Sequence, residues 1–126
     1  MAGLGSSRIM AFVATTDAKR ARTFYEGVLG LTVTSEDGFA LALDVNGTPV
    51  RVAVVREIAV AAYTVLGFCV ADIAESIRAL RERGVRFESY EFLVQDALGV
   101  WTSPSGARIA WFKDPDGNVL SLTQTT

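Results

Sequence analysis

The sequence predicts an α+β fold made of two βαβββ modules, and three observations lead to this prediction. A unit of strand, capped helix and glycine stop occurs twice in the 126-residue chain, about 55 residues apart. After each helix, the spacing of the apolar residues changes from a helical period to a strand period. Turn residues then separate short apolar runs. Because one module of this size buries little surface, we expect the two to share one core, as a single domain over 9–126.

The first module is expected over 9–57. An apolar run at 9–14 predicts a strand, Asp17 is placed to cap the next helix, and Gly30 follows the last helical position. The period-2 runs predict three strands, at 31–34, 39–44 and 50–56. The dipeptide Asn46-Gly47 predicts a hairpin turn. Residues 1–8, rich in Gly and Ser, are expected to be a flexible tail.

The second module is expected over 64–126 and repeats this order. The run at 64–70 predicts a strand, Asp72 caps a helix, and Gly84 ends it. Four further runs predict strands, at 85–92, 99–102, 107–112 and 119–123. Pro and Gly residues within 104–106 and 114–118 predict turns. The segment 93–98 has no clear period, and we interpret it as a lid or rim.

Composition excludes several classes of function. The chain contains no histidine, which excludes His-based metal sites, catalytic triads and proton shuttles. The single cysteine, Cys69, excludes an internal disulfide, and we expect it to be a small buried residue rather than a reactive thiol. Twelve basic against fourteen acidic residues leave a net charge of −2, so we expect no nucleic-acid partner. With no leader and no apolar run of about 20 residues, we expect a cytoplasmic protein that does not enter the membrane.

Three stretches of the sequence carry a resemblance to a known family. They are Asp17 with residues 24–31, residues 70–73 with the helix that runs to Gly84, and residues 111–118, WFKDPDGN. In these stretches the chain resembles the vicinal oxygen chelate superfamily, which includes glyoxalase I, fosfomycin-modifying enzymes and bleomycin resistance proteins. The resemblance implies paired βαβββ modules that curve into a half-open, cupped β-barrel. It further implies helices outside, a ligand cavity inside and a homodimer.

The resemblance also implies where enzymes of the family hold a divalent metal through His and Glu. These positions fall on Met10, Val65 and Ser121, with a fourth position within 50–56. That last segment contains no carboxylate, and Glu57 lies just outside it. The side chains of Met, Val and Ser cannot replace imidazole and carboxylate ligands of such a metal. We therefore expect neither a metal centre nor another cofactor.

Strand alternation predicts which residues line the cavity. Met10, Phe12 and Ala14 face one way, as do Val65, Gly67 and Cys69. The family pattern implies that Ile109 and Trp111 point inward. A tight turn at 104–105 would place Trp101 on the opposite face or at the rim, so that only one tryptophan lines the cavity. The candidate polar groups at the mouth are Arg51, Glu57, Tyr63, Tyr90, Asp96 and Ser121. The candidate ligand-binding residues are Met10, Phe12, Arg51, Val65, Tyr90, Trp101, Ile109, Trp111 and Ser121.

An apolar, aromatic cavity without His or a metal favours burial and ring stacking of a small molecule over proton transfer. Our leading hypothesis is a metal-independent binding protein of the glyoxalase/bleomycin-resistance type, which sequesters an apolar or aromatic metabolite or antibiotic. The alternative is a lyase, isomerase or dioxygenase relative with relocated catalytic groups, in which Glu57, Asp96 or Tyr90 acts as acid or base. A third is an interaction module with no small-molecule role. No catalytic residue can be assigned from the sequence.

Overall fold

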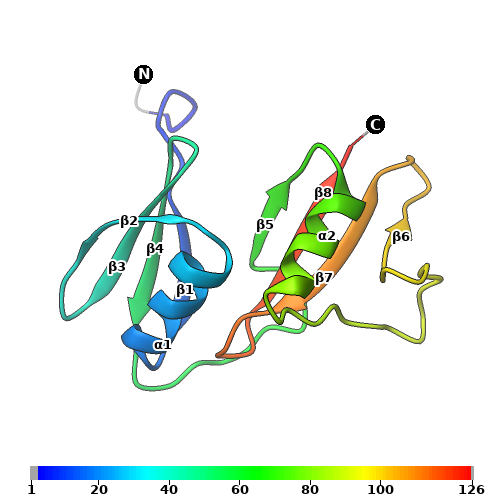
Figure 1. Cartoon of the computed structure of the whole chain (residues 1–126). Helices are drawn as coiled ribbons and strands as arrows, with labels where there is room; N and C mark the ends of the chain where they lie inside the picture. Colours follow the sequence, from blue (N-terminus) through cyan, green and yellow to red (C-terminus); the bar gives the residue numbers. More distant parts are fainter. Residues whose placement is uncertain (1–2, 126) are drawn as a thin grey trace. The chain divides into compact units, whose positions relative to one another are not determined.

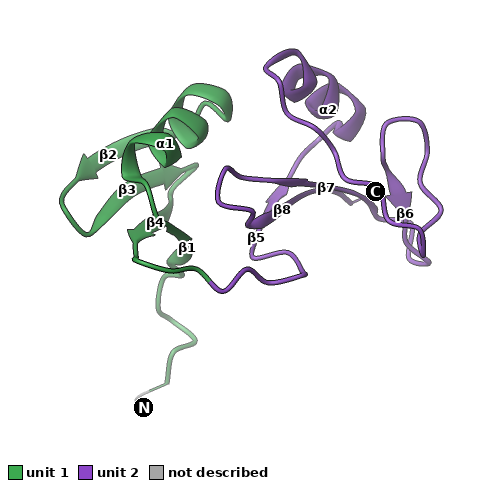
Figure 2. Cartoon of the chain, turned by 90° about the horizontal axis from the view of Figure 1, so that it is seen from below, with its two compact units in different colours: residues 1–58 green, residues 59–126 purple. Residues whose placement is uncertain are grey.

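Each half of the chain builds its own four-stranded mixed sheet, in a computed structural model that describes residues 3–125. Residues 1–58 form unit 1 and residues 59–126 form unit 2 (Figure 2). The expected α+β class and the two βαβββ modules are confirmed (Figure 1). No helix in the described part of the chain is long and apolar enough to span a lipid bilayer.

Unit 1 contains strands β1 (Ala11–Thr15), β2 (Thr32–Glu36), β3 (Ala40–Val45) and β4 (Thr48–Val54). They lie in the order β1-β4-β3-β2, with β1 parallel to β4 and the other pairs antiparallel. The turn predicted at Asn46-Gly47 is confirmed, since both residues have positive φ (49° and 89°), as the tight hairpin between β3 and β4 requires. Of the expected tail 1–8, residues 1 and 2 lie outside the described residues. Arg8 Nη2 donates a hydrogen bond to the Gly47 carbonyl oxygen (2.7 Å).

The first helix is more complex than its apolar spacing suggests. Asp17 caps it as expected, because its carboxylate accepts a hydrogen bond from Arg20 N (3.1 Å). Helix α1 (Ala18–Arg22) then widens into a π-helical segment, η1 (Thr23–Val28), at whose end Leu29 N donates to Phe24 O (2.9 Å). Helix α1 packs on β3 and β4. The core of unit 1 consists of fully or almost fully buried side chains: Val13, Ala21, Tyr25, Ala40, Leu41, Leu43, Val50 and Val52.

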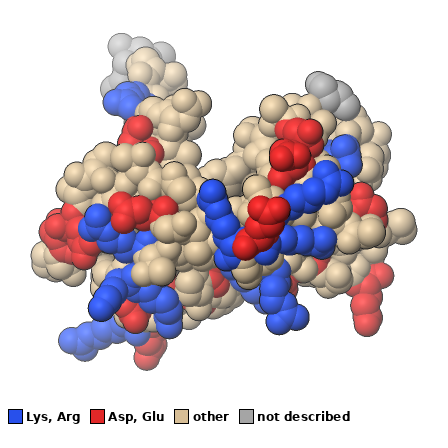
Figure 3. All heavy atoms as spheres, in the orientation of Figure 1, with Lys and Arg blue, Asp and Glu red and all other residues tan. Residues whose placement is uncertain are grey.

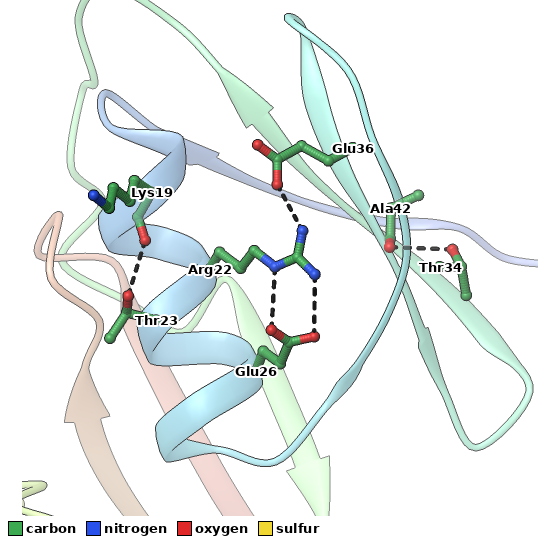
Figure 4. Close-up of polar contacts among 7 residues, drawn as sticks. All are labelled: Lys19, Arg22, Thr23, Glu26, Thr34, Glu36 and Ala42. Carbon is green, nitrogen blue, oxygen red and sulfur yellow. Dashed lines mark hydrogen bonds and ion pairs between the residues drawn. The ribbon is translucent and has the colours of Figure 1, made fainter.

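A surface ion-pair network ties the helix to the edge strand β2 (Figure 4). The Arg22 guanidinium lies 3.1 Å from a Glu26 carboxylate oxygen and 2.9 Å from one of Glu36. In β2, the register shifts between Val33 and Ser35, and the intervening Thr34 donates its hydroxyl to Ala42 O (3.1 Å). Because these pairs are solvent-exposed and screened by water, they contribute little to stability.

Unit 2 contains β5 (Leu66–Cys69), α2 (Ile73–Glu82), β6 (Trp101–Thr102), β7 (Arg108–Lys113) and β8 (Val119–Gln124). The strand order is β5-β8-β7-β6, with β5 parallel to β8. Asp72 caps α2 as expected, accepting a hydrogen bond from Glu75 N (3.1 Å). The helix packs on β7 and β8 (Figure 1) and buries Ile73 and Ile77 completely. The strand residues of this core are Leu66, Ala110, Phe112, Leu120 and Leu122.

The strand expected at 85–92 is wrong. Only Phe87 forms a bridge, to Phe112 in β7, and Glu88 N donates to Trp111 O (2.8 Å). Beyond that point the backbone bonds to a side chain instead of a neighbouring strand. Gln95 Oε1 accepts a hydrogen bond from Tyr90 N (2.7 Å), and Gln95 Nε2 donates one to Glu88 O (3.0 Å). The Tyr90 N–H and the Glu88 carbonyl are thereby hydrogen-bonded within a loop, which returns to the edge of β7 at the short strand β6.

Candidate ligand-binding site

The sheet of unit 2 has one face covered by α2 and one face that carries most of the predicted site. Residues Ala110 and Phe112 alternate toward the helix and are completely buried, so Ile109 and Trp111 face the other way. Ser121 is paired with Trp111 on one side and with Gly67 on the other, which places all three on this second face. We call it the open face of unit 2.

Trp101 lies on the open face together with Trp111, which corrects the expectation that the two point to opposite sides. Trp101 pairs with Ile109 rather than with Arg108. The turn is longer than assumed, because residues 103–107 form the loop, closed by hydrogen bonds from Ser103 N to Ala107 O (2.8 Å) and from Gly106 N to Ser103 O (2.9 Å). This shift of one residue reverses the face of Trp101, as strand alternation requires.

Four rings from three segments meet in what we call the aromatic cluster: Tyr90, Phe92, Trp101 and Trp111. The centroids of Tyr90 and Trp111 are 5.6 Å apart at 78°, an edge-to-face contact. Trp101 lies 6.2 Å from Trp111 and Phe92 lies 5.6 Å from Tyr90, with smaller interplanar angles. Phe92 is 83% exposed, so the cluster has an accessible side.

The loop that carries Tyr90 is held by two polar side chains. The Gln95 side chain accepts a hydrogen bond from Tyr90 N through Oε1. Its Nε2 donates hydrogen bonds to Glu88 O and to Gly99 O (2.8 Å). Asp96 Oδ1 accepts hydrogen bonds from Leu98 N and Val100 N, both at 2.9 Å. Gln95 was not among the residues predicted for the site, since a glutamine in a segment without periodicity carries no signal of its partners. The segment interpreted as a lid or rim is thus internally bonded.

A hollow of about 350 Å³ adjoins the cluster at its Trp101 end. It is lined by Val94, Gln95, Asp96, Val100, Trp101, Thr102 and Arg108. The lining combines apolar side chains with one acidic and one basic group, Asp96 and Arg108.

Tyr90 remains a neutral phenol at physiological pH. Burial raises its pKa above the ordinary value, and the negative charge of Glu88 raises it further. Glu88 is itself paired with Lys113, whose Nζ lies 3.6 Å from a Glu88 carboxylate oxygen.

The sequence profile of the Glyoxalase/Bleomycin resistance protein/Dioxygenase superfamily matches residues 7–122, which is most of the chain. The chain belongs to this superfamily. The resemblance inferred from the three sequence stretches is therefore confirmed.

Solved structures of superfamily members share the fold at low sequence identity. A protein assigned to the glyoxalase family from Bacillus anthracis is 16% identical, with a TM-score of 0.77 and full coverage of both chains. Lactoylglutathione lyase from Agrobacterium tumefaciens is also 16% identical, with a TM-score of 0.74 over 94% of this chain and 93% of its own. A superfamily member from Sphaerobacter thermophilus is 22% identical, with a TM-score of 0.73 over 98% of this chain and 100% of its own. A search of curated proteins found no match.

The positions that the superfamily implies for a metal do not carry suitable ligands. They offer a thioether at Met10, an isopropyl group at Val65 and a hydroxyl at Ser121. Within residues 3–125, no three Cys, Asp or Glu side chains lie close enough together to hold a metal ion. The residues present thus do not fit the divalent metal of the superfamily's enzymes.

The predicted site residues are divided between the two units. Unit 2 brings together Tyr90, Trp101, Ile109, Trp111 and Ser121, and strand alternation adds the partly exposed Val65 to the same face. Unit 1 presents Met10, Phe12 and Arg51 on the face of its own sheet that points away from α1. Phe12 is 59% exposed and pairs with Arg51. Glu57 and Tyr63 lie in the exposed segment between β4 and β5.

Cys69 is exposed, which contradicts the expectation of a buried residue. It is the last residue of the edge strand β5. Strand alternation points Leu66 toward the core and Cys69 toward the open face.

Charged side chains of both signs are interspersed on the surface seen in Figure 3, in keeping with the small net charge.

Proposed function

We propose that the protein binds a small apolar or aromatic molecule without a metal ion and sequesters it unchanged, as a binding protein of the bleomycin-resistance type. The observation that carries this proposal is the aromatic cluster on the open face of unit 2. Its rings come from a bonded loop and two paired strands, so they are held in place before a ligand arrives. Stacking on such rings contributes about 0.5–1.5 kcal/mol per contact beyond the burial of area.

The relocated-site enzyme receives less support from the contacts. Asp96 Oδ1 already accepts two backbone hydrogen bonds, and Glu57 lies on an exposed segment. Tyr90 is protonated and can only donate a proton, without an identified base as its counterpart. This alternative, the homodimer and the cytoplasmic location stay predictions.

Both tryptophans should report ligand binding, because both belong to the aromatic cluster. We expect an aromatic ligand from a panel of antibiotics and metabolites to quench the intrinsic fluorescence. Trp101→Phe and Trp111→Phe should each weaken binding several-fold, since the smaller ring loses stacking area. Quenching titrations of the wild type and both variants measure this. Phe39→Leu, at a residue 80% exposed in unit 1, is the control expected to bind as the wild type does. If both tryptophan variants keep wild-type affinity, the cluster is not the site.

Metal independence is tested by melting. Adding Ni²⁺, Mn²⁺, Zn²⁺ or Fe²⁺ should leave the Tm unchanged, because a ligand raises the Tm only by binding the native state and the expected metal positions lack ligands. Differential scanning fluorimetry with and without each metal provides the measurement. A rise in Tm that a chelator reverses would overturn this part of the proposal.

A further inference from the structure

The open face of unit 2 contains a hydroxyl with no protein partner. Ser121 is only 5% exposed, yet its side chain makes no hydrogen bond to any residue of the described chain. Among the residues that the structure describes, every completely buried side-chain nitrogen or oxygen atom has a hydrogen-bond partner. Because the Ser121 hydroxyl has none, its oxygen atom must keep some accessible surface. A hydroxyl that lies in a largely buried residue, has no protein partner and keeps an accessible oxygen atom is available to a ligand.

A glycine keeps the space beside this hydroxyl free. Gly67 pairs with Ser121 across β5 and β8, and a Cβ atom at Gly67 would lie 3.1 Å from Ser121 Oγ. Gly67 lies in a strand and its φ is not in the left-handed region, so the backbone does not require glycine. Glycine in a strand weakens it and commonly marks a place where another group approaches closely.

The aromatic cluster lies next to this hydroxyl. Trp111 is the partner of Ser121 on β7, and Tyr90 contacts Trp111 edge-to-face. A flat molecule stacked on the Trp111 ring would therefore bring its edge to the row formed by Gly67 and Ser121. Ser121 is 5% exposed, and burial at this place disfavours a charged group that has no partner of opposite charge.

We propose that Gly67 and Ser121 form a polar subsite that selects a neutral, flat aromatic ligand with a hydroxyl or carbonyl group at its edge. Ser121 Oγ accepts a hydrogen bond from the hydroxyl or donates one to the carbonyl. Gly67 leaves the space that this edge group occupies. The inference rests on the proposed function and adds the chemical class of the ligand and a residue that determines specificity.

Three probes with the same ring and different edge groups test the subsite by equilibrium dialysis: 2-naphthol, 2-methylnaphthalene and 2-naphthoate. The wild type should bind 2-naphthol about three- to tenfold more tightly than 2-methylnaphthalene, as expected for one hydrogen bond. It should bind 2-naphthoate most weakly. Ser121→Ala should bind the two neutral probes equally, because it lacks the hydroxyl that distinguishes them. Gly67→Ala should lose the preference for 2-naphthol, because its methyl group crowds the hydroxyl.

Ser105→Ala, at an exposed serine in the turn before β7, is the matched control and should retain the wild-type preference. Thermal melting of each variant shows that it is folded. Equal binding of the two neutral probes by the wild type, a preference that survives in Ser121→Ala, or tightest binding of 2-naphthoate would overturn the subsite while aromatic binding stands. If none of the probes binds and none quenches the tryptophans, both the proposed function and the subsite fail.

Discussion

Phe112→Ala is expected to lower the free energy of unfolding by about 3–5 kcal/mol, the usual cost of truncating a fully buried phenylalanine. Phe112 is completely buried in β7 on the face that α2 covers, and its ring lies 5.3 Å from that of Phe87 between centroids. The truncation would leave a cavity beneath the helix. It would also weaken the only bridge that ties residue 87 to the sheet. Equilibrium unfolding in urea measures the change.

Phe39→Ala is the matched control for this prediction. The same side chain is removed, but Phe39 is 80% exposed, so the free energy of unfolding should change by less than about 0.5 kcal/mol. A loss below about 1 kcal/mol for Phe112→Ala would show that the site collapses around the truncated side chain or that Phe112 is not in the core.

Asp114→Ala should destabilise the protein by about 3 kcal/mol, because it removes a buried carboxylate that accepts hydrogen bonds within the turn. Asp114 is 5% exposed and organises the turn between β7 and β8. Its Oδ1 accepts from Asp116 N and Asn118 N, both at 2.9 Å, and its Oδ2 accepts from Asn118 Nδ2 at 2.7 Å. Urea unfolding again provides the measurement, and Asp44→Ala, at an exposed aspartate of β3, is the control.

The effect of Asp114→Ala should extend to binding. The turn sets the register in which Ser121 lies opposite Trp111, so a looser turn should weaken the ligand site as well as the fold. Loss of stability comparable to that of Asp44→Ala would mean that water replaces the carboxylate at this turn, and would refute the prediction.

Local signals in the sequence were sufficient for the helix starts and for the first hairpin. Asp17 and Asp72 cap their helices through the backbone N–H three residues on, and Asn46-Gly47 forms its turn. These features depend on a few neighbouring residues, whose preferences for such conformations are strong. Alternation along β1 and β5 likewise predicted that Phe12 lies on the same face as Ala14, and that Gly67 lies on the same face as Cys69.

Features that depend on distant partners or on exact loop length were not predictable from these signals. The Gln95 side chain satisfies backbone groups that a strand at 85–92 would have paired with a neighbour. The register of Trp101 follows from the loop 103–107, and one residue in that loop decides the face of the sheet. For the same reason the sequence identified the members of the aromatic cluster in part but not their meeting on one face.

The π-helical turn after α1 has a consequence for sequence alignment. A ring closed from residue 29 back to residue 24 holds one residue more than the corresponding α-helical ring. A relative whose helix stays α-helical would reach the same strand with one residue fewer, so a correct alignment between the two needs a single-residue gap within 23–28. Without that gap, every position between this turn and the next compensating gap would be compared with its neighbour, and at identities of 16–22% the error would pass unnoticed.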